Sequence, residues 1–188
     1  MVTTQRTISL SLEEFLKLPE TKPASEYING EIIQKPMPQG KHSRLQSKLV
    51  TNINQVIETN KTGLAFPELR CTFGGRSIVP DVTVFSWERI PVDEGGDIAN
   101  VFKTHPDWTI EILSPGQNQT KVTANILHCL QYGSKLGWLI DPEVKMILVF
   151  YPNQQTELFD LPEDVLPVPE IFAELSLTLG DVFGWLKL

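Results

Sequence analysis

The chain of 188 residues has few cysteines and histidines, and it lacks long apolar runs. Its two cysteines, Cys71 and Cys129, do not have the spacing of zinc ligands, and three scattered histidines do not complete a set, so we expect no structural zinc. We expect both cysteines to be small core residues in the reducing cytoplasm. No segment approaches the ~18 apolar residues of a membrane span. Residues 1–10 lack the features of a signal peptide.

The chain also lacks an excess of positive charge. Its net charge of −7 at first argues against a nucleic-acid partner. However, residues 1–135 hold 14 Lys/Arg and 14 Asp/Glu, whereas residues 136–188 hold 2 Lys/Arg and 9 Asp/Glu, which is the whole surplus. The charge of the larger part is balanced, so charge neither supports nor excludes DNA binding.

Apolar spacing predicts strands that alternate with helices in one domain spanning residues 1–188. A long helix is predicted over 42–59 and a second over 118–134. A hairpin is predicted over 26–33, because Asn29-Gly30 is typical of a tight turn. Further strands are predicted near 64–73, 77–85, 108–113, 136–140, 146–151 and 156–161. Short helices are expected after a cap at Ser9 or Ser11 and near 179–186, with an irregular excursion over 87–106.

Two carboxylates interrupt apolar segments that are typical of buried strands. Asp81 lies in Val-Pro-Asp-Val-Thr-Val-Phe, and Glu111 lies in Trp-Thr-Ile-Glu-Ile-Leu-Ser-Pro. Burying an acid in such a segment costs free energy unless a partner or a cation neutralises it. Two acids on neighbouring strands therefore indicate a divalent-metal site suited to phosphate chemistry. The alternative is that each acid lies at a strand end and faces water.

The order of elements resembles a known nuclease core. Helix, strand, strand, strand, helix and strand, with Pro80-Asp81 on the middle strand and Glu111 on the next, match the PD-(D/E)XK nucleases. From about Ser9 to Leu186 the chain is similar to the Uma-two family of restriction-endonuclease-like proteins. The motifs that carry this resemblance are, in order, Tyr-Ile-Asn-Gly-Glu at 27–31, Val-Pro-Asp-Val at 79–82, Glu-Ile-Leu-Ser-Pro at 111–115 and Gly-Trp-Leu-Ile-Asp-Pro at 137–142.

The resemblance implies an α/β fold with a restriction-endonuclease-like core, in which helices flank a mixed central sheet and extra strands lie at both ends. It also implies an endonuclease that hydrolyses DNA with Mg²⁺, or Mn²⁺, held by Asp81 and Glu111. The lysine that usually follows the second acid is replaced by Leu113. In the Uma-two family that lysine has moved to the following helix, to the position of Asn125 here. Lys121, one turn earlier, is the remaining catalytic candidate.

Lys121 and Asn125 belong to a polar stripe that also contains His128 and Tyr132. The alternative to a catalytic role is that this stripe is the solvated face of an amphipathic helix. Two other functions also remain open. One is a nucleic-acid-binding module whose nuclease site has degenerated, which Leu113 and Asn125 at the lysine positions suggest. The other is a protein-interaction domain, which the acidic C-terminal third suggests.

Other polar residues are accessory candidates. The resemblance places Glu31 and Glu68 near the cleft, where either could hold a second metal, whereas strand alternation predicts exposed faces, especially for Glu26. His42 begins the long helix and is a further accessory candidate. Three basic residues share one edge of that helix, which could contact a phosphate backbone or simply be solvated. They are Lys41, Arg44 and Lys48.

Cleavage of both strands would most simply require a symmetric homodimer, because the chain has one candidate site. Apolar residues in the excursion, namely Trp87, Ile90 and Val92, form the preferred interface, although Trp87 could equally cover the cleft. Phe183, Trp185 and Leu186 near the C-terminus are the alternative, although Trp185 is expected to close the core of its own monomer.

Overall fold

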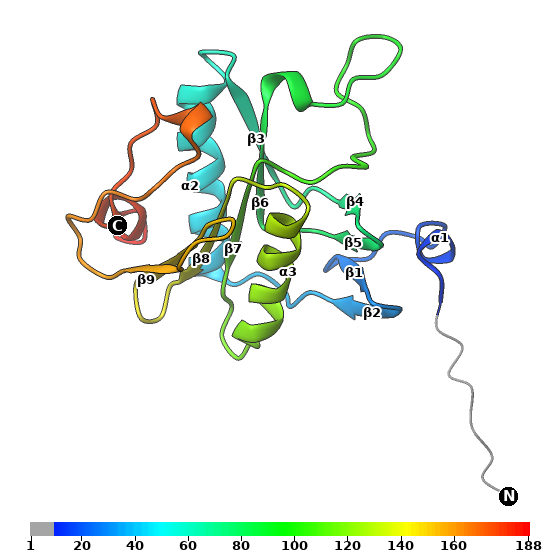
Figure 1. Cartoon of the computed structure of the whole chain (residues 1–188). Helices are drawn as coiled ribbons and strands as arrows, with labels where there is room; N and C mark the ends of the chain where they lie inside the picture. Colours follow the sequence, from blue (N-terminus) through cyan, green and yellow to red (C-terminus); the bar gives the residue numbers. More distant parts are fainter. Residues whose placement is uncertain (1–9) are drawn as a thin grey trace, which may run out of the picture.

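A six-stranded mixed sheet forms the centre of the computed structural model, which describes residues 10–188 (Figure 1). The strand order is β10-β9-β8-β7-β6-β3. The strands are β3 (Gly63–Pro67), β6 (Val82–Ser86), β7 (Trp108–Ile112), β8 (Leu136–Asp141), β9 (Met146–Phe150) and β10 (Glu157–Phe159). Only β7 and β8 are parallel in this sheet. A parallel pair requires a crossover, and here α3 (Gln119–Gln131) makes it.

A second sheet of four strands lies beside the first and has the order β2-β1-β5-β4. The predicted hairpin forms half of it, with β1 (Ser25–Ile28) and β2 (Glu31–Gln34) joined at Asn29 and Gly30. Both turn residues have positive φ, 53° and 88°, as a tight Asn-Gly turn requires. The other half is β4 (Cys71–Phe73) and β5 (Arg76–Ile78), which pair in antiparallel fashion.

Helices cover both faces of the six-stranded sheet. On one face α2 (Gly40–Ile57) buries Leu45, Leu49, Ile53 and Ile57 in the main core, which also contains the C-terminal segment. Burying a Leu or Ile side chain contributes about 1.5–3 kcal/mol, so this apolar stripe fixes α2 firmly against the sheet. On the other face α3 packs through Val122 and Ile126 in a smaller cluster. The site described below depends on both helices.

The structure divides two of the predicted strands. The segment expected to be one strand over 64–73 contributes β3 to the large sheet and β4 to the small one, with Glu68 at positive φ (47°) between them. The segment predicted over 77–85 divides near Pro80, which has no N–H to donate to a sheet. Apolar side chains continue across both breaks, so the periodicity of the sequence alone does not reveal where these strands end.

The ends of the described chain carry shorter elements. The N-terminal helix is α1 (Leu12–Phe15), capped by Ser11, and the other predicted cap, Ser9, lies outside the described residues. The excursion over 87–106 contains a 3-10 turn at Trp87–Arg89 and isolated bridges between Val92 and Ile98 and between Phe102 and Cys71, and it is otherwise irregular. A second 3-10 turn, Glu170–Phe172, precedes α4 (Leu179–Gly184). Within residues 10–188, none of the helices has the length and apolar character needed to cross a membrane.

Candidate functional site

The pairing of β6 with β7 brings Asp81 and Glu111 together. Val82 lies opposite Ile110 in this antiparallel pair, so continuing the register by one residue places Asp81 opposite Glu111. Side chains directly opposite each other in such a pair share one face of the sheet. Each of the two residues is only 2% exposed. The interpretation in which both acids face water is therefore wrong, because a second layer of structure covers the strand ends.

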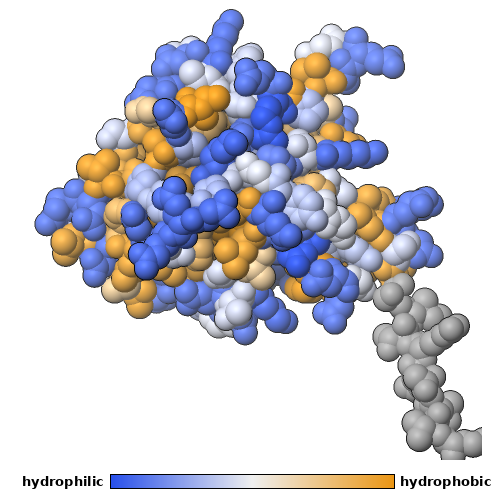
Figure 2. All heavy atoms as spheres, in the orientation of Figure 1, coloured by the Kyte–Doolittle hydropathy of each residue, from blue (hydrophilic) through white to orange (hydrophobic). Residues whose placement is uncertain are grey.

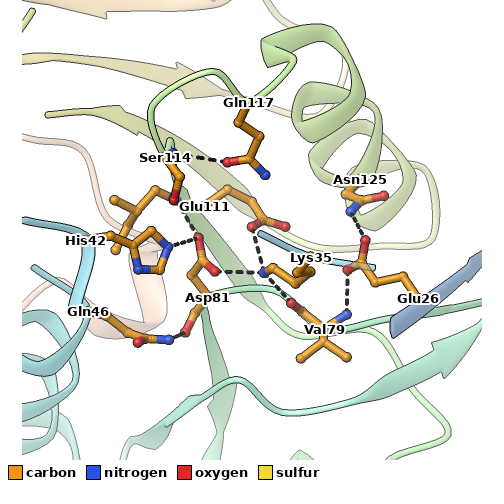
Figure 3. Close-up of polar contacts among 11 residues, drawn as sticks. Glu26, Lys35, His42, Gln46, Val79, Asp81, Glu111, Ser114, Gln117 and Asn125 are labelled. Carbon is orange, nitrogen blue, oxygen red and sulfur yellow. Dashed lines mark hydrogen bonds and ion pairs between the residues drawn. The ribbon is translucent and has the colours of Figure 1, made fainter. Parts of the chain in front are cut away.

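An ammonium group lies between the two carboxylates (Figure 3). Lys35 Nζ donates to Asp81 Oδ1 at 2.7 Å and to the carbonyl oxygen of Val79 at 2.7 Å, and it lies 3.6 Å from Glu111 Oε2. Lys35 directly follows β2, and its backbone N–H donates to the carbonyl of Ala24. The hairpin of the second sheet therefore places Lys35 next to Asp81 and Glu111 of the six-stranded sheet.

The side chain of Asp81 is held by several donors. Its Oδ2 accepts from the backbone N–H of Ile112 at 2.7 Å and lies 3.1 Å from His42 Nε2. Its carbonyl oxygen accepts from Gln46 Nε2 at 2.9 Å. Burial alone would raise the pKa of Asp81, but Lys35 and His42 hold that pKa below its usual range. The carboxylate is therefore anionic, and Lys35, His42 and the backbone N–H of Ile112 fix its direction.

Glu111 has a different environment from its partner. Its Oε1 is buried and has no hydrogen-bond donor among residues 10–188. Burial raises the pKa of Glu111 well above its ordinary value, Lys35 opposes the shift, and the nearby Asp81 and Glu26 carboxyl groups reinforce it. A cation would stabilise the ionised form of this carboxyl group, because the group is buried, its pKa is raised and its Oε1 lacks a donor.

Glu26 is a third buried acid, and the expectation that it faces solvent is wrong. It is 5% exposed, and it accepts from the backbone N–H of Val79 at 2.8 Å and from Asn125 Nδ2 at 3.1 Å. Alternation was misleading because β1 is an inner strand of a second sheet that is itself covered. Asn125 and His128 are buried as well, so the stripe on α3 is not simply a solvated face, although Lys121 is exposed.

Two cavities meet at Lys35. The larger, of about 430 Å³, is lined by Lys35, His42, Glu68, Asp81, Ser114 and Gln117 together with the segment before β1. The smaller, of about 120 Å³, reaches Glu111 and is lined by Glu26, Lys121 and Asn125, among others. Of the accessory candidates, Glu68 therefore faces the cavity of Asp81. Glu31 is exposed on β2 and lines neither of these two cavities.

The predicted basic edge of α2 lies at the surface. Lys41 Nζ lies 2.9 Å from Glu143 Oε1, and both side chains are more than half exposed. Arg44 Nε donates to the carbonyl oxygen of Trp185 at 3.0 Å. Lys41 and His42 also line a third cavity, of about 300 Å³, so the first turn of α2 adjoins the site. Lys48 lies further along the helix and is partly buried.

Lys35 is the main residue that the sequence did not reveal. The sequence offers one signal, a lysine directly after the second strand of an Asn-Gly hairpin. That signal does not indicate which residues the lysine contacts. Its contact with Asp81 joins residues 46 positions apart that flank strands of two different sheets. Gln117, which lines both cavities at Lys35 and accepts from the backbone N–H of Ser114 at 3.1 Å, was missed for the same reason.

Comparison with known proteins identifies a matching family and a similar solved structure. Residues 12–180 match the model of the Uma2 (Uma-two) family, described as a putative restriction endonuclease. The fold is similar to the crystal structure of a putative nuclease belonging to DUF820 from Anabaena variabilis, with a TM-score of 0.93 and 60% sequence identity over 95% of this chain and 99% of that chain. None of the curated proteins matches this chain. The fold class predicted from the sequence is confirmed.

Proposed function

This chain belongs to the Uma2 family of restriction-endonuclease-like proteins, as its motifs predicted, and we propose that it is a metal-dependent endonuclease that hydrolyses DNA phosphodiester bonds. The family and the DUF820 structure support a nuclease in general terms. The observation that carries the proposal is the buried pair of Asp81 and Glu111 at the meeting point of two cavities.

The residues present fit a divalent cation. Carboxylate oxygens are the ligands that Mg²⁺ and Mn²⁺ prefer, and Glu111 Oε1 is a buried acceptor without a donor among the described residues. One buried lysine lies among three buried acids, Glu26, Asp81 and Glu111, so the acidic groups of the cluster outnumber the ammonium group. Asp81 and Glu111 would hold Mg²⁺ or Mn²⁺, which when bound polarises the scissile phosphate and lowers the pKa of water.

The protein's own residues would act around this cation. His42 and Gln46 orient Asp81, and the backbone N–H of Ile112 keeps its carboxylate directed toward the cluster. Lys35, which lines both cavities, would supply the ammonium group that the motif position at Leu113 does not provide. Lys121, on the wall of the smaller cavity, would steady the charge that develops on the phosphate.

The substrate would approach over the mouth of the larger cavity and the first turns of α2. Lys41 and Arg44 are exposed there, and Lys22 lines the cavity itself, so cationic side chains are available to backbone phosphates. Lys48 extends the same edge of α2. We place this activity in the cytoplasm, whose reducing conditions suit the two free cysteines, Cys71 and Cys129.

The direct test is cleavage of supercoiled plasmid DNA with Mg²⁺ or Mn²⁺. We expect nicked or linear product with the wild-type protein and none with Glu111→Ala, while EDTA stops the reaction. Metal-independent binding of DNA without cleavage would instead favour the degenerate nucleic-acid-binding module. Neither cleavage nor DNA binding, measured by gel shift with Ca²⁺, would leave a protein-interaction domain.

Lys121→Ala tests the role of the exposed lysine. Its side chain is at the surface, so we expect the free energy of unfolding to change by less than ~0.5 kcal/mol. Loss of one charge that contacts the phosphate should lower the cleavage rate about tenfold, equivalent to about 1.4 kcal/mol of the activation barrier. Single-turnover cleavage and urea unfolding measure the two effects. Full activity of the variant would remove Lys121 from the mechanism.

We further propose that cleavage of both strands is carried out by a homodimer. Phe183 is buried, and Trp185 and Leu186 pack against the core of the same chain, which argues against the C-terminal interface. Trp87 and Val92 are 44% and 64% exposed on the excursion, and hydrophobic residues are visible at the upper right of Figure 2, where the excursion lies. We expect Val92→Glu to make the protein monomeric by light scattering. A wild-type monomer at all concentrations, with and without DNA, would contradict this assembly.

A further inference from the structure

Lys35 occupies the position that a bound cation would be expected to take. Its ammonium lies 2.7 Å from Asp81 Oδ1 and 3.6 Å from Glu111 Oε2 (Figure 3). The same group is held by the carbonyl oxygen of Val79 at 2.7 Å. In this position the ammonium group neutralises the two carboxylates as a metal would, because it supplies positive charge and interacts with oxygens of both.

One ammonium does not satisfy the whole cluster. Glu26 also acts on Lys35, so three acids surround a single lysine, and one oxygen of Glu111 remains without a donor among residues 10–188. A divalent cation carries twice the charge of the ammonium and accepts more oxygen ligands. The cluster therefore interacts more favourably with a divalent cation than with Lys35, and the two positive groups would repel each other if they shared it.

The structure has space into which the side chain of Lys35 can move. Lys35 lines both the cavity of about 430 Å³ and the cavity of about 120 Å³. Its side chain is 14% exposed, and the segment that follows, residues 36–38, is exposed between β2 and α2. A lysine has a long, flexible stem, so rotation about its side-chain bonds can move the ammonium several ångströms without moving β2.

We infer that Lys35 holds the metal position in the metal-free protein and leaves it when a divalent cation binds, which places its ammonium in the adjoining cavity for the substrate phosphate. This inference rests on the proposed function, since it concerns the same carboxylates. It makes Lys35 an internal competitor of the metal as well as a phosphate-binding group.

Isothermal titration with Mn²⁺ tests the competition without any turnover. Lys35→Met removes the competing charge, and we expect it to bind Mn²⁺ about tenfold more tightly than the wild type. We also expect a lower melting temperature without metal and a larger rise on adding Mn²⁺, because binding to the folded state alone stabilises it. Lys17→Met is the matched control: it removes an exposed lysine paired with Glu13 at 2.8 Å, and it should leave Mn²⁺ affinity unchanged.

The wild-type protein gives a second measurement that does not depend on a variant folding. Acetylation of lysines, followed by mass spectrometry, should label Lys35 slowly without metal and faster once Ca²⁺ or Mn²⁺ is added, whereas Lys17 labels equally in both. Unchanged Mn²⁺ affinity in a folded Lys35→Met, or labelling of Lys35 that does not respond to a cation that binds, would overturn the inference. A wild type that binds no Mn²⁺ would instead contradict the proposed function.

Discussion

Glu111→Gln should abolish metal-dependent cleavage and at the same time make the metal-free protein more stable. The amide cannot act as an anionic ligand, and metal assistance is worth several kcal/mol, so we expect the cleavage rate to fall by at least about a thousandfold. Stability should rise by about 1 kcal/mol, because the neutral amide avoids burying a charged carboxylate beside Asp81 and Glu26. Plasmid cleavage and urea unfolding in EDTA measure the two effects.

The gain in stability should depend on pH in a defined direction. The folded-state pKa of Glu111 is raised, so its contribution to stability is full below the unfolded value of about 4.3 and is lost as the pH rises through the folded-state pKa. The advantage of Glu111→Gln should therefore be small near pH 4 and grow toward neutral pH. Glu58→Gln, at an exposed position, should show neither effect. A variant of Glu111 that is less stable than the wild type at pH 8 would contradict this account.

Asp81→Asn should have the opposite effect on stability. Asp81 is the carboxylate that accepts from Lys35 at 2.7 Å and from the backbone N–H of Ile112 at 2.7 Å. Without that charge the buried ammonium of Lys35 loses its nearest carboxylate and keeps only more distant acids such as Glu111, and breaking a buried ion pair costs about 3–5 kcal/mol. Cleavage should be lost together with stability. Urea unfolding at pH 7, compared with Glu111→Gln, measures the contrast.

The pH dependence of this loss also follows from the pKa. The folded-state pKa of Asp81 is lowered, so its contribution is present above the unfolded value of about 3.9 and is lost as the pH falls toward the folded-state pKa. The difference between the wild type and Asp81→Asn should therefore be greatest near neutral pH and shrink in acid. If Asp81→Asn unfolds at the same urea concentration as the wild type, Asp81 does not hold Lys35 in solution.

The elements and the pair of strand acids could be predicted from the sequence, because both depend on local patterns. The spacing of Leu45, Leu49 and Ile53 predicts the buried stripe of α2, and Asn29-Gly30 predicts the turn between β1 and β2. Asp81 and Glu111 are conspicuous because charged residues are rare in apolar strand segments. The family and the fold follow from the order of these motifs along the chain.

Which groups surround the acids was decided only by the tertiary structure. Lys35 and Glu26 come from the β1–β2 hairpin of the second sheet and His42 comes from α2, so the groups around Asp81 and Glu111 belong to segments far apart in the chain. Periodicity describes how one segment presents its faces, but it does not say which other segment covers them. For this reason the sequence indicated two acids on neighbouring apolar strands, whereas only the fold decided that they are buried together, that a lysine lies between them and that their pKa values shift in opposite directions.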